Sequence, residues 1–201
     1  GTGKIVLELT KLLESIGVSV RLNTTIEKIK IDNSRISELI DSRGIVHKAD
    51  VYVSNMDPLH LYKNLINEKI NPSIFFKKNF SKTSMGLFVL FFGTKKRYEN
   101  VQHHTIIFGK EYKRLLKKIF KGNELPDDIS IYLHRPTATD KSFAPKNCDS
   151  FYALVPVPNL KANINWRTSG NAFKDHVIKV LSDKILFNLE NNIVEEFYMP
   201  P

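Results

Sequence analysis

The spacing of hydrophobic residues changes from helical to strand-like within the first 50 positions. Apolar residues recur every three or four positions from Ile5 to Ile16, which predicts an amphipathic helix that Gly17 ends in a left-handed conformation. Strand-like runs, separated by turn-forming Asp, Asn, Ser and Gly, then follow at residues 18–22, 25–31, 36–40 and 45–48. This half of the chain is therefore predicted to begin with a helix and continue as a small β-meander.

The apolar run at residues 49–55 predicts a buried strand, and Pro58 is placed to open a helix after it. Longer β-rich runs, joined by long connections, follow at residues 83–93, 104–108, 129–135 and 150–156. A final helix is predicted over residues 171–189. The long connections favour a mixed or antiparallel sheet over tight βαβ units, so we predict an α+β protein with a mixed sheet in its second part.

The positive charge is confined to the middle of the chain. Residues 61–150 carry 17 Lys and Arg against 8 Asp and Glu, which accounts for the whole net charge of +9. Such segregation predicts a partner with an anionic surface, either nucleic acid or anionic lipid, although a generally lysine-rich proteome is an alternative. The single cysteine excludes a disulfide framework. The chain opens directly on the predicted helix, without a signal-peptide pattern, so a cytoplasmic location is expected.

A basic amphipathic helix is predicted at residues 110–121. One stripe is apolar and includes Leu116 and Phe120, while lysine and arginine occupy the opposite face. This pattern suits a peripheral membrane contact on an anionic surface, and the alternative is a surface helix that packs its stripe on its own domain. The residues predicted to make the membrane contact are Lys110, Lys113, Arg114, Leu116, Lys117 and Phe120. Nucleic acid is not expected, because the aromatic residues lie inside apolar runs rather than on exposed stacking platforms.

Two histidine motifs, His103-His104 and His134-Arg135, invite a metal or catalytic interpretation. A metal site needs a third ligand at a suitable spacing, and the sequence pattern offers none. We therefore predict no metal site and interpret the histidines as ordinary surface or strand-end residues.

The segment from His103 to Pro158 carries a family resemblance through the fixed order of its parts. HHTIIFG leads a β-rich run, the basic helix follows, LPDD precedes a strand that ends LHRP, and T-D-x-S-x-A-P leads to a strand ending VPVP. Together with GTGKIVLELTKLLESIGVSV at the start, this order resembles the bacterial phytoene (carotenoid) desaturases of the flavin-containing amine oxidoreductase superfamily. The resemblance implies an FAD-dependent enzyme that passes a hydride from a lipophilic polyene to the flavin.

The resemblance also implies a domain division and a set of cofactor contacts. Residues 1–57 would be the distal part of an FAD-binding domain, 58–190 the substrate domain, and 191–201 the start of a return to the FAD domain. The positions that match the family's flavin-contacting residues are Gly1, Thr2, Gly3, Ile26, Ser54 and Asn55. The family's G-x-G-x-x-G fingerprint and C-terminal flavin motif are absent from these residues, so FAD is expected in the complete enzyme but not to be retained by this chain alone.

Catalytic residues are unknown from the sequence, and Arg135 is a weak candidate because a cation beside a substrate can stabilise developing charge. Two alternatives to the desaturase interpretation stay open. One is a non-catalytic basic module that binds a membrane or nucleic acid, and the other is a different flavin amine oxidase or a retinoid saturase relative.

Overall fold

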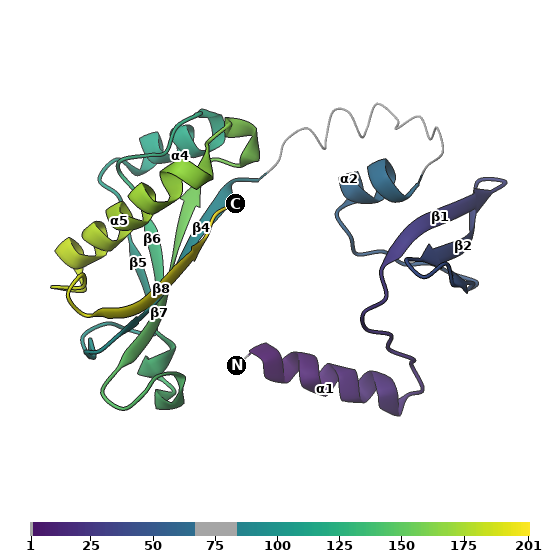
Figure 1. Ribbon diagram of the computed structural model, residues 1–201, viewed down its shortest axis with the longest axis horizontal. Helices are drawn as coiled ribbons and strands as arrows, with labels where there is room; N and C mark the ends of the chain where they lie inside the picture. The colour runs from purple at the N-terminus through teal and green to yellow at the C-terminus, as the bar shows by residue number, and fades with distance from the viewer. Residues whose placement is uncertain (1, 67–83) are drawn as a thin grey trace. The chain divides into compact units, whose positions relative to one another are not determined.

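The computed structural model describes residues 2–66 and 84–201, and the chain divides into two compact units, Gly1–Ser81 and Lys82–Pro201 (Figure 1). Each unit is described by itself below. Helices and antiparallel sheets share the chain, which confirms the predicted α+β class. In the described residues, no helix is both long enough and apolar enough to cross a lipid bilayer.

The first unit begins with the predicted helix α1, Thr2–Ser15. Gly17 adopts a positive φ of 83°, and the N–H of Val18 donates to the carbonyl of Leu13 (2.9 Å), so the helix ends in the left-handed turn that the glycine indicated. The strand predicted at residues 18–22 does not form, because no neighbouring strand of the described chain pairs with this segment.

The predicted meander consists of β1 Ile26–Asp32, β2 Arg35–Asp41 and β3 Val46–His47, paired antiparallel in that order. The buried strand predicted at residues 49–55 is wrong: this segment is not a strand, and Val53 is 91% exposed. An apolar run alone could not specify burial, since burial requires a covering element. Pro58 does open a helix, α2 Pro58–His60, which continues as a π-helical turn, Leu61–Leu65.

A buried carboxylate holds the turn between β2 and β3. Asp41 accepts hydrogen bonds from the N–H groups of Arg43 (3.0 Å) and Ile45 (2.9 Å) and contacts the His47 ring nitrogen (3.1 Å). Burial alone would raise the pKa of Asp41. The hydrogen bonds from these donors and from the Arg43 side chain outweigh that effect, so the pKa is lowered to about 2. The turn therefore depends on an ionised Asp41.

The second unit is built on a five-stranded sheet in which every described pairing is antiparallel, so of the two predicted arrangements, mixed or antiparallel, the antiparallel one is found. The strand order is β5-β6-β7-β4-β8. In chain order the strands are β4 Gly86–Thr94, β5 His104–Ile107, β6 Ile131–His134, β7 Asp149–Val157 and β8 Ile193–Met199. Short 3₁₀ turns occur at Pro136–Ala138, Lys141–Phe143 and Leu160–Ala162.

Two helices complete this unit: α4 Tyr112–Lys121 and α5 Trp166–Lys184. The last helix starts five residues earlier than predicted, because Asn165 caps it by accepting the N–H of Arg167 (3.1 Å). Within residues 191–201, strand β8 pairs with β4 at the edge of this sheet. The described units thus divide the chain elsewhere than at residue 57.

The core of the second unit lies between one face of the sheet and α5. Phe88, Leu90 and Phe92 of β4 point into it and are at most 4% exposed. Phe173 and Val177 of α5 are also buried in it. The segment around α4 lies on the same side, since Lys184 Nζ of α5 donates to the carbonyl of Phe108 (3.2 Å). Both helices are therefore associated with one side of the sheet, and the opposite face carries neither (Figure 1).

Candidate functional site

The face of the sheet that points away from α5 is apolar and aromatic. Residues in a strand alternate between faces, and the burial pattern along β4 and β7 follows that alternation, with fully buried and partly exposed residues in turn. We call the partly exposed side the open face. It is formed by every second residue of all five strands.

The strand register aligns the open face into two rows that cross the sheet. The first row runs from β5 to β8 through His104, His134, Tyr152, Phe91 and Phe197. The second row runs in the same direction through Ile106, Tyr132, Leu154, Val89 and Met199. With strands about 4.8 Å apart, each row spans about 19 Å.

The rings of the first row touch in sequence. Phe197 stacks on Phe91 with ring centroids 4.7 Å apart, and Phe91 lies 5.8 Å from Tyr152. Tyr152 lies 4.6 Å from His134, which in turn stacks on His104 at 5.3 Å. These separations fall in the range for favourable aromatic pairs, so the row forms one continuous aromatic surface.

The open face is accessible within its own unit. Phe197 is 60% exposed, Ile106 is 62% exposed, and Met199 is 57% exposed. Single exposed apolar residues are ordinary, but a contiguous set of them marks a ligand or interaction surface. Its aromatic rings and lack of charge along the middle strands suit a flat, apolar, π-rich ligand.

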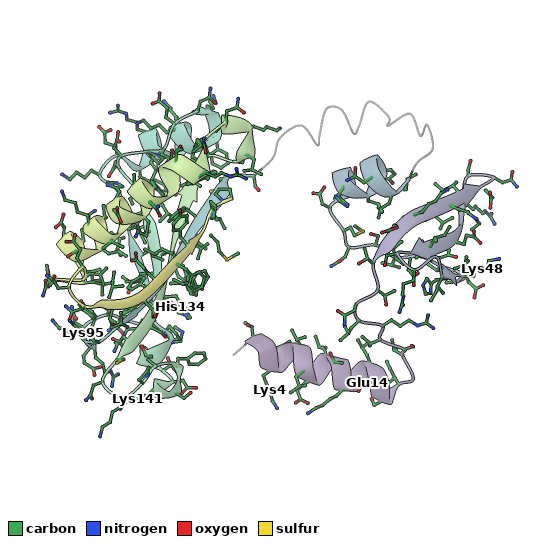
Figure 2. The ribbon with its side chains drawn as sticks, viewed as in Figure 1. Lys4, Glu14, Lys48, Lys95, His134 and Lys141 are labelled. Carbon is green, nitrogen blue, oxygen red and sulfur yellow. The ribbon has the colours of Figure 1, made fainter. Side chains whose placement is uncertain are left out.

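Three histidines gather at one end of the first row, where β5 and β6 meet (Figure 2 labels His134). The ring nitrogens His103 Nε2 and His134 Nε2 are 2.8 Å apart. His103 Nδ1 contacts the Thr139 hydroxyl, and His104 Nδ1 lies 2.7 Å from the Tyr132 hydroxyl. Burial and the two neighbouring histidines lower the pKa of His134, so the neutral imidazole is favoured there.

The cluster brings together three possible metal ligands, whereas the spacing of the histidines in the sequence did not indicate a third one. His103-His104 and His134 are about 30 positions apart, and only the antiparallel pairing of β5 with β6 places His104 opposite His134. Within the described residues, one ring nitrogen from each histidine lies within 4.8 Å of the others. The grouping depends on strand pairing, for which the sequence carried no local signal.

Arg135 does not face the open side. It is 2% exposed, its Nε donates to Asp149 (3.0 Å), and its NH1 donates to the carbonyl of Val101 (2.8 Å). Asp149 in turn accepts the N–H of Tyr98 (2.7 Å) and the hydroxyl of Thr137 (2.6 Å). The geometry therefore assigns Arg135 a structural role in a buried ion pair, in place of the catalytic role considered from the sequence.

The residues predicted to contact a flavin lie in the first unit, and Gly1 is outside the described residues. Thr2 and Gly3 form the first turn of α1, Ile26 starts β1 and is half-buried, and Ser54 is exposed. Asn55, next to Ser54, is also exposed. Among the described residues, no hydrogen bond links α1 to the meander.

The predicted apolar stripe of α4 is divided between the core and the surface. Leu115 and Ile119 are buried, Leu116 is half-buried, and Tyr112 and Phe120 are exposed. The predicted cationic contacts, which are Lys110, Lys113, Arg114 and Lys117, are all exposed. Leu115 and Ile119 therefore pack on their own domain, which was the alternative to membrane contact. Phe120 instead remains exposed beside lysines.

Curated proteins match this chain along its whole length. No model of a known protein family matches the chain. The phytoene desaturase (lycopene-forming) of Pseudescherichia vulneris is 34% identical over 206 residues, which cover 100% of this chain and 41% of that protein. The phytoene desaturase (neurosporene-forming) of Rhodobacter capsulatus is 36% identical over 208 residues, covering 100% and 40%. The chain thus spans about two fifths of the length of these curated relatives, and the resemblance stated from the sequence is confirmed.

Two solved structures share the fold. An oxidoreductase from Methanosarcina mazei gives a TM-score of 0.65 at 11% identity, covering 96% of this chain and 40% of its own. The PF1083 protein of Pyrococcus furiosus gives 0.63 at 13% identity, covering 97% and 41%. At these identities the comparison supports the architecture alone.

Replacing Asp149→Asn should destabilise the second unit by about 3 kcal/mol, because it removes the buried counter-charge of Arg135 and leaves only the exposed Glu99 at 3.4 Å. The only tryptophan, Trp166, packs against this unit's core, so its fluorescence during urea unfolding follows the unit directly. The exposed control Asp183→Asn should change the unfolding free energy by less than about 0.5 kcal/mol. Equal unfolding midpoints for the two variants would contradict a structural ion pair.

Proposed function

Since the chain is a homologue of the phytoene desaturases along its whole length, we propose that the complete protein is an FAD-dependent carotenoid desaturase of the phytoene type. The observation that carries the proposal is the open face, with its continuous aromatic row across all five strands. A long polyene is apolar and has π electrons, and such a surface matches the chemistry of a part of it. The substrate, the cofactor and the reaction of the whole protein are parts of this proposal.

In this proposal the second unit binds and orients the polyene. Phe91, Tyr152 and Phe197 provide ring faces against which the chain of carbon atoms would lie, and Val89 and Met199 flank them in the second row. Burial of apolar surface contributes roughly 25 cal/mol per Å², so a long hydrocarbon gains affinity without polar anchors. An apolar contact along its length would also exclude water from the reacting carbon atoms.

The first unit would contribute to the flavin site. Among the described residues, a Cβ added to Gly3 would meet no atom within 4 Å, and this fits the close approach of a planar ring to the first turn of α1. Thr2 and Gly3, with Ile26, Ser54 and Asn55, are the described positions proposed to contact FAD. When bound, FAD supplies a hydride acceptor, and the chain's own residues supply binding and orientation.

Membrane contact through α4 is proposed as the route by which a lipid-soluble substrate reaches the protein. Phe120 is 58% exposed, and Tyr112 is 47% exposed beside Phe108, whose ring centroid lies 5.6 Å away. Lys113 and Lys117 are exposed on the adjoining surface of the helix. Aromatic residues at the acyl boundary with lysines near anionic headgroups are typical of an interfacial helix, and the proposal implies a peripheral association.

The substrate part of the proposal predicts the effect of making the open face polar. In the complete gene product, Phe197→Ser combined with Met199→Ser should lower kcat/KM for phytoene by about tenfold, because two exposed contacts with the polyene are lost. The assay supplies phytoene in lipid vesicles with FAD and follows the visible absorbance of the conjugated product. Flavin content should stay that of the parent.

The matched control for that assay is Phe187→Ser, since Phe187 is 62% exposed but lies after α5, outside the sheet. It should leave kcat/KM unchanged. If the double variant turns over phytoene as efficiently as the control, the open face is not the substrate surface. A parent protein that binds flavin yet acts on an amine rather than a polyene would instead favour the amine oxidase alternative.

The membrane part predicts selective vesicle binding. The protein should bind anionic vesicles, bind neutral ones weakly, and be released when the salt concentration passes a few hundred millimolar, where the screening length falls below about 6 Å. Phe120→Ser should weaken the binding about tenfold without unfolding the protein, because its ring is largely exposed. Lys117→Gln should weaken it about fivefold, in line with about 1 kcal/mol per lysine.

The control is Phe143→Ser, which removes a similarly exposed ring (56%) from the 3₁₀ turn Lys141–Phe143. Vesicle sedimentation at low salt compares the four proteins, and Trp166 fluorescence verifies that each is folded. Phe120→Ser and Phe143→Ser binding equally well would exclude α4 as the membrane contact.

A further inference from the structure

The cluster of His103, His104 and His134 has the composition of a transition-metal site. Imidazole nitrogen is a preferred ligand of Zn²⁺ and related divalent ions, and three such nitrogens leave a fourth position open. In a tetrahedral site with Zn–N distances of about 2.0 Å, ligand nitrogens lie about 3.3 Å apart. The three histidines already place one nitrogen each within 4.8 Å of the others, and one pair stands at 2.8 Å. Small ring rotations would therefore bring them to metal-binding distances.

The surroundings of the cluster supply the outer hydrogen bonds that metal-binding histidines need. His103 Nδ1 is engaged by the Thr139 hydroxyl, and His104 Nδ1 by the Tyr132 hydroxyl. Such contacts on Nδ1 help to fix the orientation of each ring, and His103 Nε2 faces His134 Nε2 within the cluster. Two of the three rings are thus held in place by contacts with residues outside the cluster.

Two further observations point to an ion rather than to three ordinary surface residues. His134 Nδ1 is buried and, within the described part of the chain, has no hydrogen-bond partner. The rings of His103 and His104 lie 4.4 Å apart, and His103 and His134 4.7 Å, so the cluster concentrates three basic groups. Several imidazole rings gathered in one place are what a metal site with histidine ligands requires.

We propose that His103, His104 and His134 bind one divalent transition-metal ion of the Zn²⁺ class at the β5–β6 end of the open face. The cluster contains no carboxylate, which disfavours Mg²⁺ and Ca²⁺. The ion would link the edge strand β5 to β6 and leave one coordination position for water. This site is independent of the proposed desaturase activity, because it rests only on the geometry of the two strands.

The test is a zinc titration of the 201-residue chain without a polyhistidine tag, after treatment with a chelator. We expect one Zn²⁺ per chain in competition with a zinc-sensitive dye, little or no binding of Mg²⁺, and visible d–d absorption of tetrahedral type with Co²⁺. Saturating zinc should raise the melting temperature reported by Trp166 by several degrees, since the ion binds the folded state.

The variants His104→Phe and His134→Phe should each weaken Zn²⁺ binding by at least tenfold and abolish the zinc-dependent rise in melting temperature. His104 is exposed, so its replacement keeps the fold while removing one ligand. His176→Gln is the matched control, because His176 lies on α5 in the same unit and contacts the carbonyl of Asp127 (2.8 Å) rather than the cluster. Less than about a tenth of an equivalent of zinc on the parent, or equal zinc affinity for parent and His104→Phe, would overturn the proposal.

Discussion

The buried ion pair between Arg135 and Asp149 is the constraint on which the second unit depends. Both side chains are at most 2% exposed. Arg135 donates to Val101, and Asp149 accepts from Tyr98 and Thr137. The network therefore ties the end of β6 and the start of β7 to the connection between β4 and β5. A charge buried in this way is tolerated only because its partner and its hydrogen bonds are present, so all these segments must occupy their places together.

The same constraint positions the open face. Arg135 follows His134 directly, and its N–H donates to the carbonyl of His103 (2.9 Å), which holds the start of β5 against the end of β6. A shift of one residue in any strand would move its entire set of aromatic side chains to the opposite face. The aromatic row and the histidine cluster are therefore consequences of a register that a buried ion pair on the covered side helps to fix.

Local structure could be predicted where the information was local. The helical spacing from Ile5 to Ile16 specified α1, and the turn residues between β1 and β2 specified the meander. The strand predicted at residues 49–55 failed because its apolar residues, such as Val53, have no covering element in the described unit. Periodicity reports which residues favour burial, but burial itself depends on a neighbour.

The site was less predictable because it is assembled across strands. Tyr152 and Phe197 were visible only as members of apolar runs, and nothing in those runs indicated that they share a row with Phe91. The charge of Arg135 made it a catalytic candidate in the sequence. Its structural role depends on the contact with Asp149, fourteen residues away. For α4 the sequence showed the stripe, while the structure showed that Ile119 belongs to the core and Phe120 to the surface.

The central claim is that the open face of the five-stranded sheet binds the polyene, and site-specific photocrosslinking tests it most directly. A benzophenone amino acid placed at position 197 of the complete gene product, in vesicles that contain phytoene, should form a phytoene adduct that mass spectrometry locates at that position. The same group at position 187, equally exposed but outside the sheet, should form little adduct. An active protein that crosslinks equally at both positions, or at neither, would contradict the account.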